Sequence, residues 1–418
     1  MNRIFIGFLL ATLAAASFLT DWGISAGEAE KSFVTFRSQE LAEKLTVGYA
    51  VLLVDVNGDG KKDIVVVDSA RVIWFENPTW KLHTIIKGVT KADNVCIDAY
   101  DIDGDGKLDF ALGAYWNPAN TKDSGTLQWL KRGARLDDPW TVYPIDTEPT
   151  IHRIRFADID GKGKAALLSV PLMGRGSSAK NNHVDGLPLR VTAYRIPGDP
   201  TKDRWMPEVL DESLHVAHNF HPIDVAGTSR KNILVASYEG VNLLRLDEGT
   251  WKRNRIGEGN QANPKGKRGA SEIKQGKLKN GAKFIATIEP WHGDQVVVYT
   301  QPEGDNEKFW RRHVIDDQLK WGHAVSVADL DGDGSDEIII GVRDDPAKTD
   351  KVTDRRGVRI YKVLDDKGAK WRRQILDYGG VAVEDLAVVD LNGDGRPDIV
   401  AVGRQTHNVR IYWNETKK

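Results

Sequence analysis

Cysteine and methionine are scarce in this 418-residue chain, and neither sign of charge is in clear excess. The single cysteine, Cys96, excludes an internal disulfide, so other features must stabilise the fold. Lys and Arg number 58 against 60 Asp and Glu, a net charge of −2. Such a balance argues against a nucleic-acid partner, which would favour a strongly basic surface. The sequence also contains no Gly-x-Ser-x-Gly elbow, phosphate-binding Gly-Lys loop or dinucleotide fingerprint, so Ser-His-Asp hydrolysis has no support.

Long apolar runs are absent except at the N-terminus. There, Arg3 is followed by an apolar run from Ile4 to about Leu19 and by small residues up to Ala26. This pattern predicts a secretory signal peptide over residues 1–27 and a secreted or periplasmic protein. The run is too short, and too poor in flanking anchors, to favour stable membrane insertion, although a retained anchor is the alternative. With no linker or composition shift, residues 28–418 are predicted to form one domain.

Four copies of a nine-residue acidic loop punctuate the chain. Oxygen-bearing side chains occupy positions 1, 3, 5 and 9 of each copy: Asp55, Asn57, Asp59 and Asp63; Asp101, Asp103, Asp105 and Asp109; Asp329, Asp331, Asp333 and Glu337; and Asp390, Asn392, Asp394 and Asp398. Such a set predicts up to four structural calcium sites. The flanking segments are short apolar runs, so each loop joins two strands, unlike an EF-hand, which joins two helices.

The loops also reveal a repeat. Weaker copies begin at Asp158, at Asp224 and at about Gln275, which gives intervals of about 46 to 66 residues. A tryptophan opens a further strand in six repeats, at Trp80, Trp140, Trp205, Trp251, Trp310 and Trp371. The seventh such strand is missing from the C-terminal end, and residues 33–37 are the predicted substitute. We therefore predict an all-β, seven-bladed β-propeller of four-stranded blades, closed by an N-terminal strand.

One position in the repeat carries unusual chemistry. In such blades the strand before the acidic loop is the innermost, and its start lies at the upper mouth of the central channel. Six residues before the seven loop starts lie Tyr49, Val95, His152, His218, Gly269, His323 and Glu384. Three of the ten histidines share this position, and equivalent positions converge on the axis. Three neutral imidazoles with an open fourth position suit a catalytic zinc ion.

Alternatives to this zinc site remain at this point. The alternative explanation for the three histidines is hydrogen bonding across the channel mouth, and His215 or His221 is an alternative to His218 as a ligand. Glu384 is predicted to be a fourth ligand or a catalytic base.

The turn after the second strand of each blade also opens on the upper face. These turns contain Trp116, Arg175, Tyr238, Glu239, Trp291, His292, Arg343, Arg404 and His407. Aromatic rings, guanidinium groups and carboxylates around a solvent-filled channel mouth suit the binding of a small sugar or a glycan. The alternative for Trp116 and Trp291 is a packing role at blade interfaces.

The loops and their flanking strands resemble the FG-GAP/VCBS repeats of integrin α-chain propellers. Four stretches, at residues 151–158 (IHRIRFAD), 171–176 (PLMGRG), 289–293 (EPWHG) and 321–324 (WGHA), also resemble the propeller domain of aldos-2-ulose dehydratases. In that family a propeller zinc is implicated in eliminating water from keto-sugars such as 1,5-anhydrofructose. The resemblance implies a zinc on His152, His218 and His323. The cupin and lectin parts of those enzymes have no counterpart in this sequence.

Two functions follow as hypotheses. The first is a zinc-dependent carbon–oxygen lyase acting on a keto-sugar, with Glu384 or His292 as the base. In this hypothesis Arg175, Arg343 and Arg404 orient hydroxyls or take up developing negative charge. The second is a non-catalytic, calcium-stabilised propeller that binds a glycan or a protein partner. The histidines at the channel mouth favour the first, because a protein-binding surface has no need of three imidazoles directed at one point.

Overall fold

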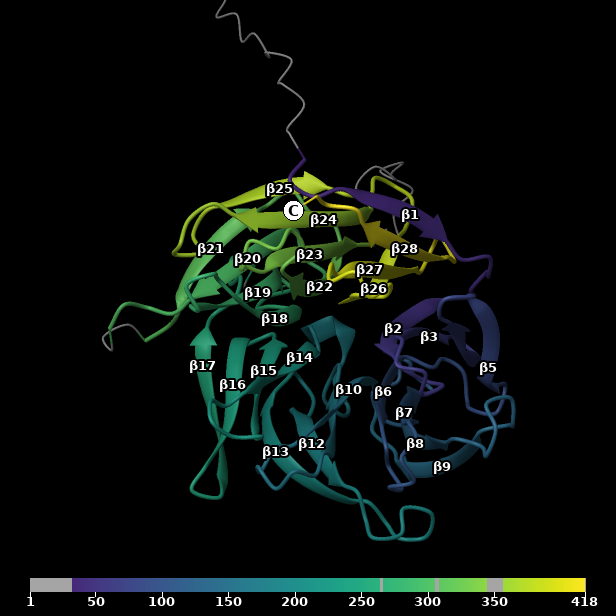
Figure 1. Ribbon diagram of the computed structural model, residues 1–418. Helices are drawn as coiled ribbons and strands as arrows, with labels where there is room; N and C mark the ends of the chain where they lie inside the picture. Colours follow the sequence, from purple (N-terminus) through teal and green to yellow (C-terminus); the bar gives the residue numbers. More distant parts are fainter. Residues whose placement is uncertain (1–31, 264–265, 305–307, 344–355, 418) are drawn as a thin grey trace, which may run out of the picture. The chain divides into compact units, whose positions relative to one another are not determined.

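The computed structural model describes residues 32–263, 266–304, 308–343 and 356–417. From Phe33 onward the chain is one compact unit in which the described residues form seven four-stranded antiparallel sheets. The sheets follow one another as blades of a ring, and the colours of Figure 1 trace them in chain order. This architecture confirms the predicted seven-bladed propeller. The predicted signal peptide, residues 1–27, lies outside the described residues.

The blades consist of the following strands. Blade one contains β2 (Gly48–Val54), β3 (Asp63–Asp68), β4 (Arg71–Glu76) and β5 (Lys81–Lys87), and blade two contains β6 (Cys96–Tyr100), β7 (Asp109–Ala114), β8 (Thr126–Lys131) and β9 (Thr141–Asp146). Blade three contains β10 (Ile151–Ala157), β11 (Ala166–Pro171), β12 (Leu189–Arg195) and β13 (Met206–Leu214), and blade four contains β14 (Ala217–Asp224), β15 (Lys231–Ser237), β16 (Gly240–Asp247) and β17 (Thr250–Gly257). Blade five contains β18 (Glu272–Lys277), β19 (Lys283–Glu289), β20 (Gln295–Thr300) and β21 (Arg311–Asp316). Blade six contains β22 (Gly322–Ala328), β23 (Glu337–Val342), β24 (Gly357–Val363) and β25 (Trp371–Ile375). Blade seven contains β26 (Val383–Val389), β27 (Asp398–Gly403), β28 (Val409–Asn414) and β1 (Phe36–Glu40).

The second strand of each blade supplies much of the core. Strands β3, β7, β23 and β27 are buried along their whole length, because both of their faces are covered by neighbouring blades. The outer strands, such as β5, contain both exposed and buried residues. Apart from one short 3-10 turn at Ala179–Asn181, the described residues are strands and their connections. No helix in this described part is long and apolar enough to cross a membrane.

The ring closes through β1, which pairs with β28 in an antiparallel register from Phe36 opposite Asn414 to Glu40 opposite Arg410. Figure 1 shows the purple β1 beside the yellow β28. The closing strand begins three residues later than predicted. Residues 33 and 34 instead bond to blade six, where Gln374 Oε1 accepts the N–H groups of both.

The acidic loops join the first and second strands of their blades, as predicted, but the fifth loop was misplaced. Strand β18 extends to Lys277, and the turn covers residues 278–282, where the Gly281 N–H bonds the Leu278 carbonyl at 2.8 Å. The prediction had started this loop at Gln275. We call the residue at the upper mouth of the channel in each blade its mouth position. It lies five residues before the end of the first strand in blades one, three, six and seven, and the same count in blade five gives Glu272. The prediction of Gly269 was wrong, because the lost acidic residues removed the marker that fixes the loop.

Candidate functional site

The mouth position corresponds to a backbone irregularity. In blades one, three, four, six and seven, the pairing of the first and second strands skips one residue near the start of the first strand. The skipped residues are Tyr49, His152, His218, His323 and Glu384. A residue in a β-bulge has no partner opposite it, and the bend redirects its side chain. The spacing found in the sequence therefore marks a repeated bulge that presents these side chains at the channel mouth.

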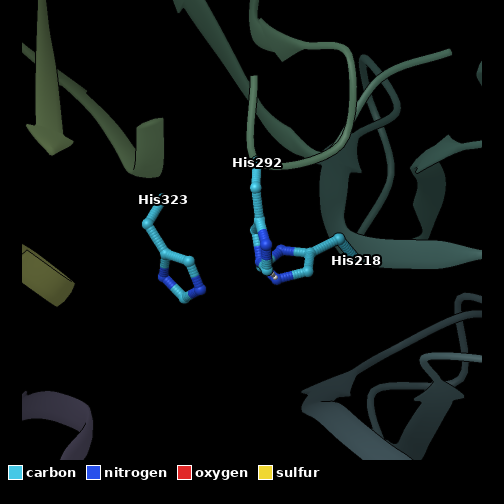
Figure 2. Close-up of side chains that lie close together, drawn as sticks. All are labelled: His218, His292 and His323. Atoms are coloured by element: carbon cyan, nitrogen blue, oxygen red, sulfur yellow. Dashed lines mark hydrogen bonds between the residues drawn. The ribbon is translucent and has the colours of Figure 1, made fainter. Parts of the chain in front are cut away.

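Three histidines from three different segments form a compact group. The ligand nitrogens of His218 on β14, His292 after β19 and His323 on β22 all lie within 4.8 Å of one another. Nε2 of His292 is 3.0 Å from Nε2 of His218. Figure 2 shows the three imidazoles approaching one another from separate parts of the backbone. The group is suited to a metal ion, because neutral imidazole nitrogens are good zinc ligands.

The membership of this group differs from the predicted ligand set. His292, predicted as a base, takes the place that the sequence assigned to His152. The His152 ring lies beside the group, with its centroid 4.6 Å from that of His218. His292 reaches the group from the turn between β19 and β20, where its φ is +50°. This left-handed conformation is uncommon for a residue with a side chain and often accompanies a functional constraint.

The other ring nitrogens of the mouth histidines bond to the next blade. Nδ1 of His152 lies 3.0 Å from the His218 carbonyl, and Nδ1 of His323 lies 2.6 Å from the Glu384 carbonyl. Carbonyl oxygens only accept, so in both rings Nδ1 carries the proton and Nε2 carries the lone pair. Nδ1 of His218 lies 2.5 Å from the Glu272 carboxylate, which also accepts from Asn219 Nδ2. With Glu272 ionised, His218 has the same tautomer. Metal-binding histidines generally donate their second N–H in this way.

Burial sets the charge of these rings. It holds the pKa of His152, His218, His292 and His323 well below the ordinary value, and nearby arginines reinforce the shift. The rings are therefore neutral and available as ligands or as bases. Burial also raises the pKa of Glu272, an effect that the positive charge of Arg153 opposes.

Glu384 lies between two arginines. Its Oε2 accepts from Arg343 Nη1 and its Oε1 from Arg404 Nη1, each at 2.8 Å. Arg343 Nη1 is also 3.1 Å from His323 Nε2, and Arg404 lies over the Tyr49 ring. Because both carboxylate oxygens are engaged, Glu384 is placed to position Arg343 and Arg404 at the mouth.

The predicted upper-face residues divide into two sets. Trp116 lies near the His152 and Tyr49 rings, and Trp291 lies 5.1 Å from His292 between ring centroids. The other predicted residues have contacts away from the group of three histidines. Arg175 is exposed and donates to the Lys122 carbonyl, and Nδ1 of His407 lies 2.9 Å from the Thr46 carbonyl. Glu239 bonds His215, and Arg268 lies over the Tyr238 ring. His221 lies deeper along β14. Sequence reasoning missed Glu272 and Trp321. The ring centroids of Trp321 and His292 are 5.0 Å apart.

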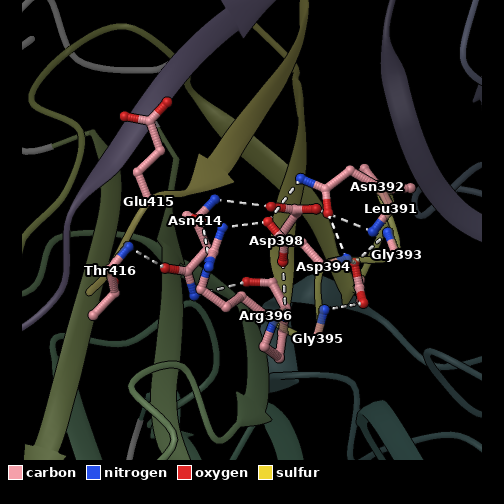
Figure 3. A network of polar contacts seen from close by, with 12 residues as sticks. Leu391, Asn392, Gly393, Asp394, Gly395, Arg396, Asp398, Asn414, Glu415 and Thr416 are labelled. Carbon is pink, nitrogen blue, oxygen red and sulfur yellow. Dashed lines mark hydrogen bonds and ion pairs between the residues drawn. The ribbon is translucent and has the colours of Figure 1, made fainter. Parts of the chain in front are cut away.

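The four intact acidic loops share one hydrogen-bond pattern. The carboxylate at position 1 accepts the two glycine N–H groups, as Asp390 does from Gly393 and Gly395. The acid at position 9 is buried in every copy: Asp63, Asp109, Glu337 and Asp398. Asp398 binds the N–H groups of Leu391 and Asn414, which ties the loop to β28 (Figure 3). The acids at positions 1 and 9 therefore shape the turn.

Two of these loops also contact a lysine. Asp101, Asp103 and Asp105 form one compact carboxylate group, and Asp329, Asp331 and Asp333 form another. Lys131 on β8 forms an ion pair with Asp103, and Lys362 on β24 pairs with both Asp331 and Asp333. In blade one, where position 3 is Asn57, its amide lies 3.4 Å from the carboxylate of Glu76 on β4. A lysine thus accompanies the more acidic loops.

Comparisons with known proteins agree with this architecture. Residues 124–302 match the family model for the beta-propeller domain of aldos-2-ulose dehydratase, and residues 55–112 match an FG-GAP-like repeat. The aldos-2-ulose dehydratase of Phanerodontia chrysosporium is 27% identical over 270 residues, which cover 60% of this chain and 29% of that protein. The chain thus spans less than a third of the length of this relative.

Solved structures show the same fold. The crystal structure of BBS1N in complex with ARL6DN, soaked with mercury, has a TM-score of 0.52 at 12% identity and covers 92% of this chain and 98% of that chain. The lead-soaked form has a TM-score of 0.51 at 13% identity, with coverage of 91% and 96%. The chain is therefore a seven-bladed propeller that contains an FG-GAP-like repeat and, over residues 124–302, resembles the propeller domain of aldos-2-ulose dehydratase.

Proposed function

We propose that the upper mouth of the channel is a zinc-dependent site that eliminates water from a keto-sugar. The observation that carries this proposal is the group of neutral nitrogens from His218, His292 and His323, within 4.8 Å of one another. The resemblance to the propeller domain of a dehydratase supports the choice of reaction and of substrate class.

These three residues fit a zinc ion. Their pKa values are low enough to keep them neutral, and His218 and His323 hold a proton on Nδ1 through a partner in the adjacent blade. Bound there, the metal would act as a Lewis acid toward the carbonyl group of the sugar. Arg343 donates to His323 Nε2 in the structure and would turn wholly toward Glu384 when that nitrogen binds a metal.

The base in this proposal is His152. Its Nδ1 donates to the His218 carbonyl, so its Nε2 carries the lone pair, which accepts a long hydrogen bond of 3.4 Å from Arg153 Nη1. His152 Nε2 takes the proton from the carbon beside the carbonyl group. The hydroxyl on the following carbon leaves with that proton as water, and a carbon–carbon double bond forms. Arg404 and Arg343 bind hydroxyl groups as charge develops on the sugar.

Metal analysis and a substrate screen test the proposal. The protein purified without chelators should contain about one zinc per chain, and each of His218→Ala, His292→Ala and His323→Ala should lose it. His152→Ala should keep the metal and lose turnover. His313→Ala, on the outer strand β21, is the matched control and should change neither. Keto-sugars should yield an unsaturated ketone, detected by its ultraviolet absorbance. A wild-type protein that takes up no zinc in titration would overturn the proposal.

A further inference from the structure

A cavity of about 590 Å³ opens beside His292 and is distinct from the central channel. Its walls include Trp291 and Trp321, whose rings lie 5.1 and 5.0 Å from the His292 ring between centroids. The volume is in the range of small-molecule sites. The cavity therefore leads from solvent to the candidate metal group.

A lysine lies between the two indoles. Lys267 Nζ is 5.0 Å from the centroid of Trp291 and 4.8 Å from that of Trp321. Two cation–π contacts hold this ammonium at a defined place on the cavity wall, although the rest of the Lys267 side chain is exposed. A fixed ammonium binds an anion with less loss of side-chain freedom than a mobile one.

Basic residues outnumber acidic ones around the described part of the cavity. Lys320 also lines it, and Arg343 lies against the Trp321 ring at 5.1 Å. The one carboxylate in the described lining is Asp294, which is exposed. A neutral sugar that stacked on the indoles would have to displace the ammonium from both rings. A sugar with an anionic group would instead keep it in place as an ion-pair partner.

We propose that this cavity selects a sugar bearing an anionic group, with Lys267 as the residue that determines the preference. The inference rests on the proposed function for its general class of ligand. It adds that the keto-sugar carries a carboxylate or a phosphate, which Lys267 binds from its place beside Trp291 and Trp321.

Binding to the full chain, measured by quenching of tryptophan fluorescence, tests this inference. The probes are 2-ketogluconate, fructose 6-phosphate and fructose, which separate carboxylate, phosphate and neutral sugars. At least one anion should bind about ten times more tightly than fructose, as expected for a charge-assisted hydrogen bond. Lys267→Met should remove the preference, whereas Lys308→Met, which loses a similar contact with Phe309, should not.

Fructose binding as tightly as both anions, or an unchanged preference in Lys267→Met, would overturn the inference. The titrations are made with metal-free and with zinc-loaded protein, because the cavity wall formed by Lys267 does not require the metal. An anion preference in a protein that takes up no zinc would support the cavity and refute the proposed lyase. Zinc-dependent turnover of neutral keto-sugars without any anion preference would support the proposed lyase and refute the role of Lys267.

Discussion

His218 and Glu272 bond across the boundary between blades four and five, with Nδ1 and Oε1 2.5 Å apart, and both side chains are about 2% exposed. The opposite nitrogen of the same ring faces His292 at 3.0 Å. One imidazole thus connects the carboxylate to the candidate metal group. Glu272 acts on that group through His218, and it does so by fixing the orientation and tautomer of the ring.

The first prediction follows from this bond. Replacing Glu272 by Gln retains the size of the side chain but removes the charge that favours a proton on Nδ1 of His218. Zinc affinity should fall by about tenfold, in line with other changes to residues that support metal ligands. Competition with a fluorescent zinc chelator measures the change. Glu212→Gln, on the exposed part of β13, is the control. Equal zinc affinities for Glu272→Gln and the wild type would argue against a supporting role for Glu272.

The second prediction concerns calcium, which we expect to bind most tightly in blade one. In blades two and six, the ammonium groups of Lys131 and Lys362 already pair with the position-3 carboxylates. In blade seven, Arg396 pairs with the position-5 carboxylate of Asp394. Saturating calcium should raise the melting temperature, with about 2.7 kcal/mol per site at one hundred times the dissociation constant. Lys131→Met and Lys362→Met should enlarge the calcium response, because each frees a carboxylate group. Thermal melts with calcium and with a chelator measure it. Identical melting points in the two conditions would contradict the prediction.

The sequence predicted the ring because two markers recur around it, the loops between the first two strands and the tryptophans of six outer strands. Glu272 was missed because the fifth loop has lost its acidic residues, so its start was predicted three residues too early. Where the loop was intact, as for His323 and Glu384, the predicted position agreed with the structure.

His292 shows the limit of reasoning from spacing. It belongs to a turn and joins the candidate metal group from a backbone position with a φ of +50°. No periodic pattern encodes such a conformation, so the sequence placed His292 on the upper face without its partners. The exchange of His152 for His292 in the group of three likewise depends on side-chain directions that the repeat does not specify.

The third prediction concerns ring closure. Deleting residues 33–40 removes β1 and exposes the edge of β28. The deletion also removes the 2.8 Å hydrogen bond from Trp413 Nε1 to Gln39 Oε1. Exposed strand edges pair with other chains, so the shortened protein should melt at a lower temperature and form aggregates. Size-exclusion chromatography and thermal melts measure both effects. A chain that begins at Phe33 is the control. A monomeric deletion variant with an unchanged melting point would show that β1 is dispensable.

The last prediction concerns Lys274, which lines the central channel below the histidines together with Glu272 and Asp385. Burial lowers the pKa of Lys274 to about 8, and the positive charge of Arg155 adds to the shift. Below pH 8 the native state carries a charged ammonium in this poorly solvated place, which costs stability. Between pH 8 and about 10.4 the unfolded chain binds more protons than the native state, so the native state gains stability as pH rises.

Lys274→Met removes this cost. The variant should therefore be more stable than the wild type at pH 7, and the difference should shrink as pH rises from 8 toward 10. Urea unfolding at pH 7 and pH 9.5 measures the two free energies of unfolding. Lys283→Met, at an exposed position of β19, controls for the general effect of losing a lysine. A stability difference that stays constant between the two pH values would mean that Lys274 keeps its ordinary pKa in the folded protein, and that the channel around it is well hydrated.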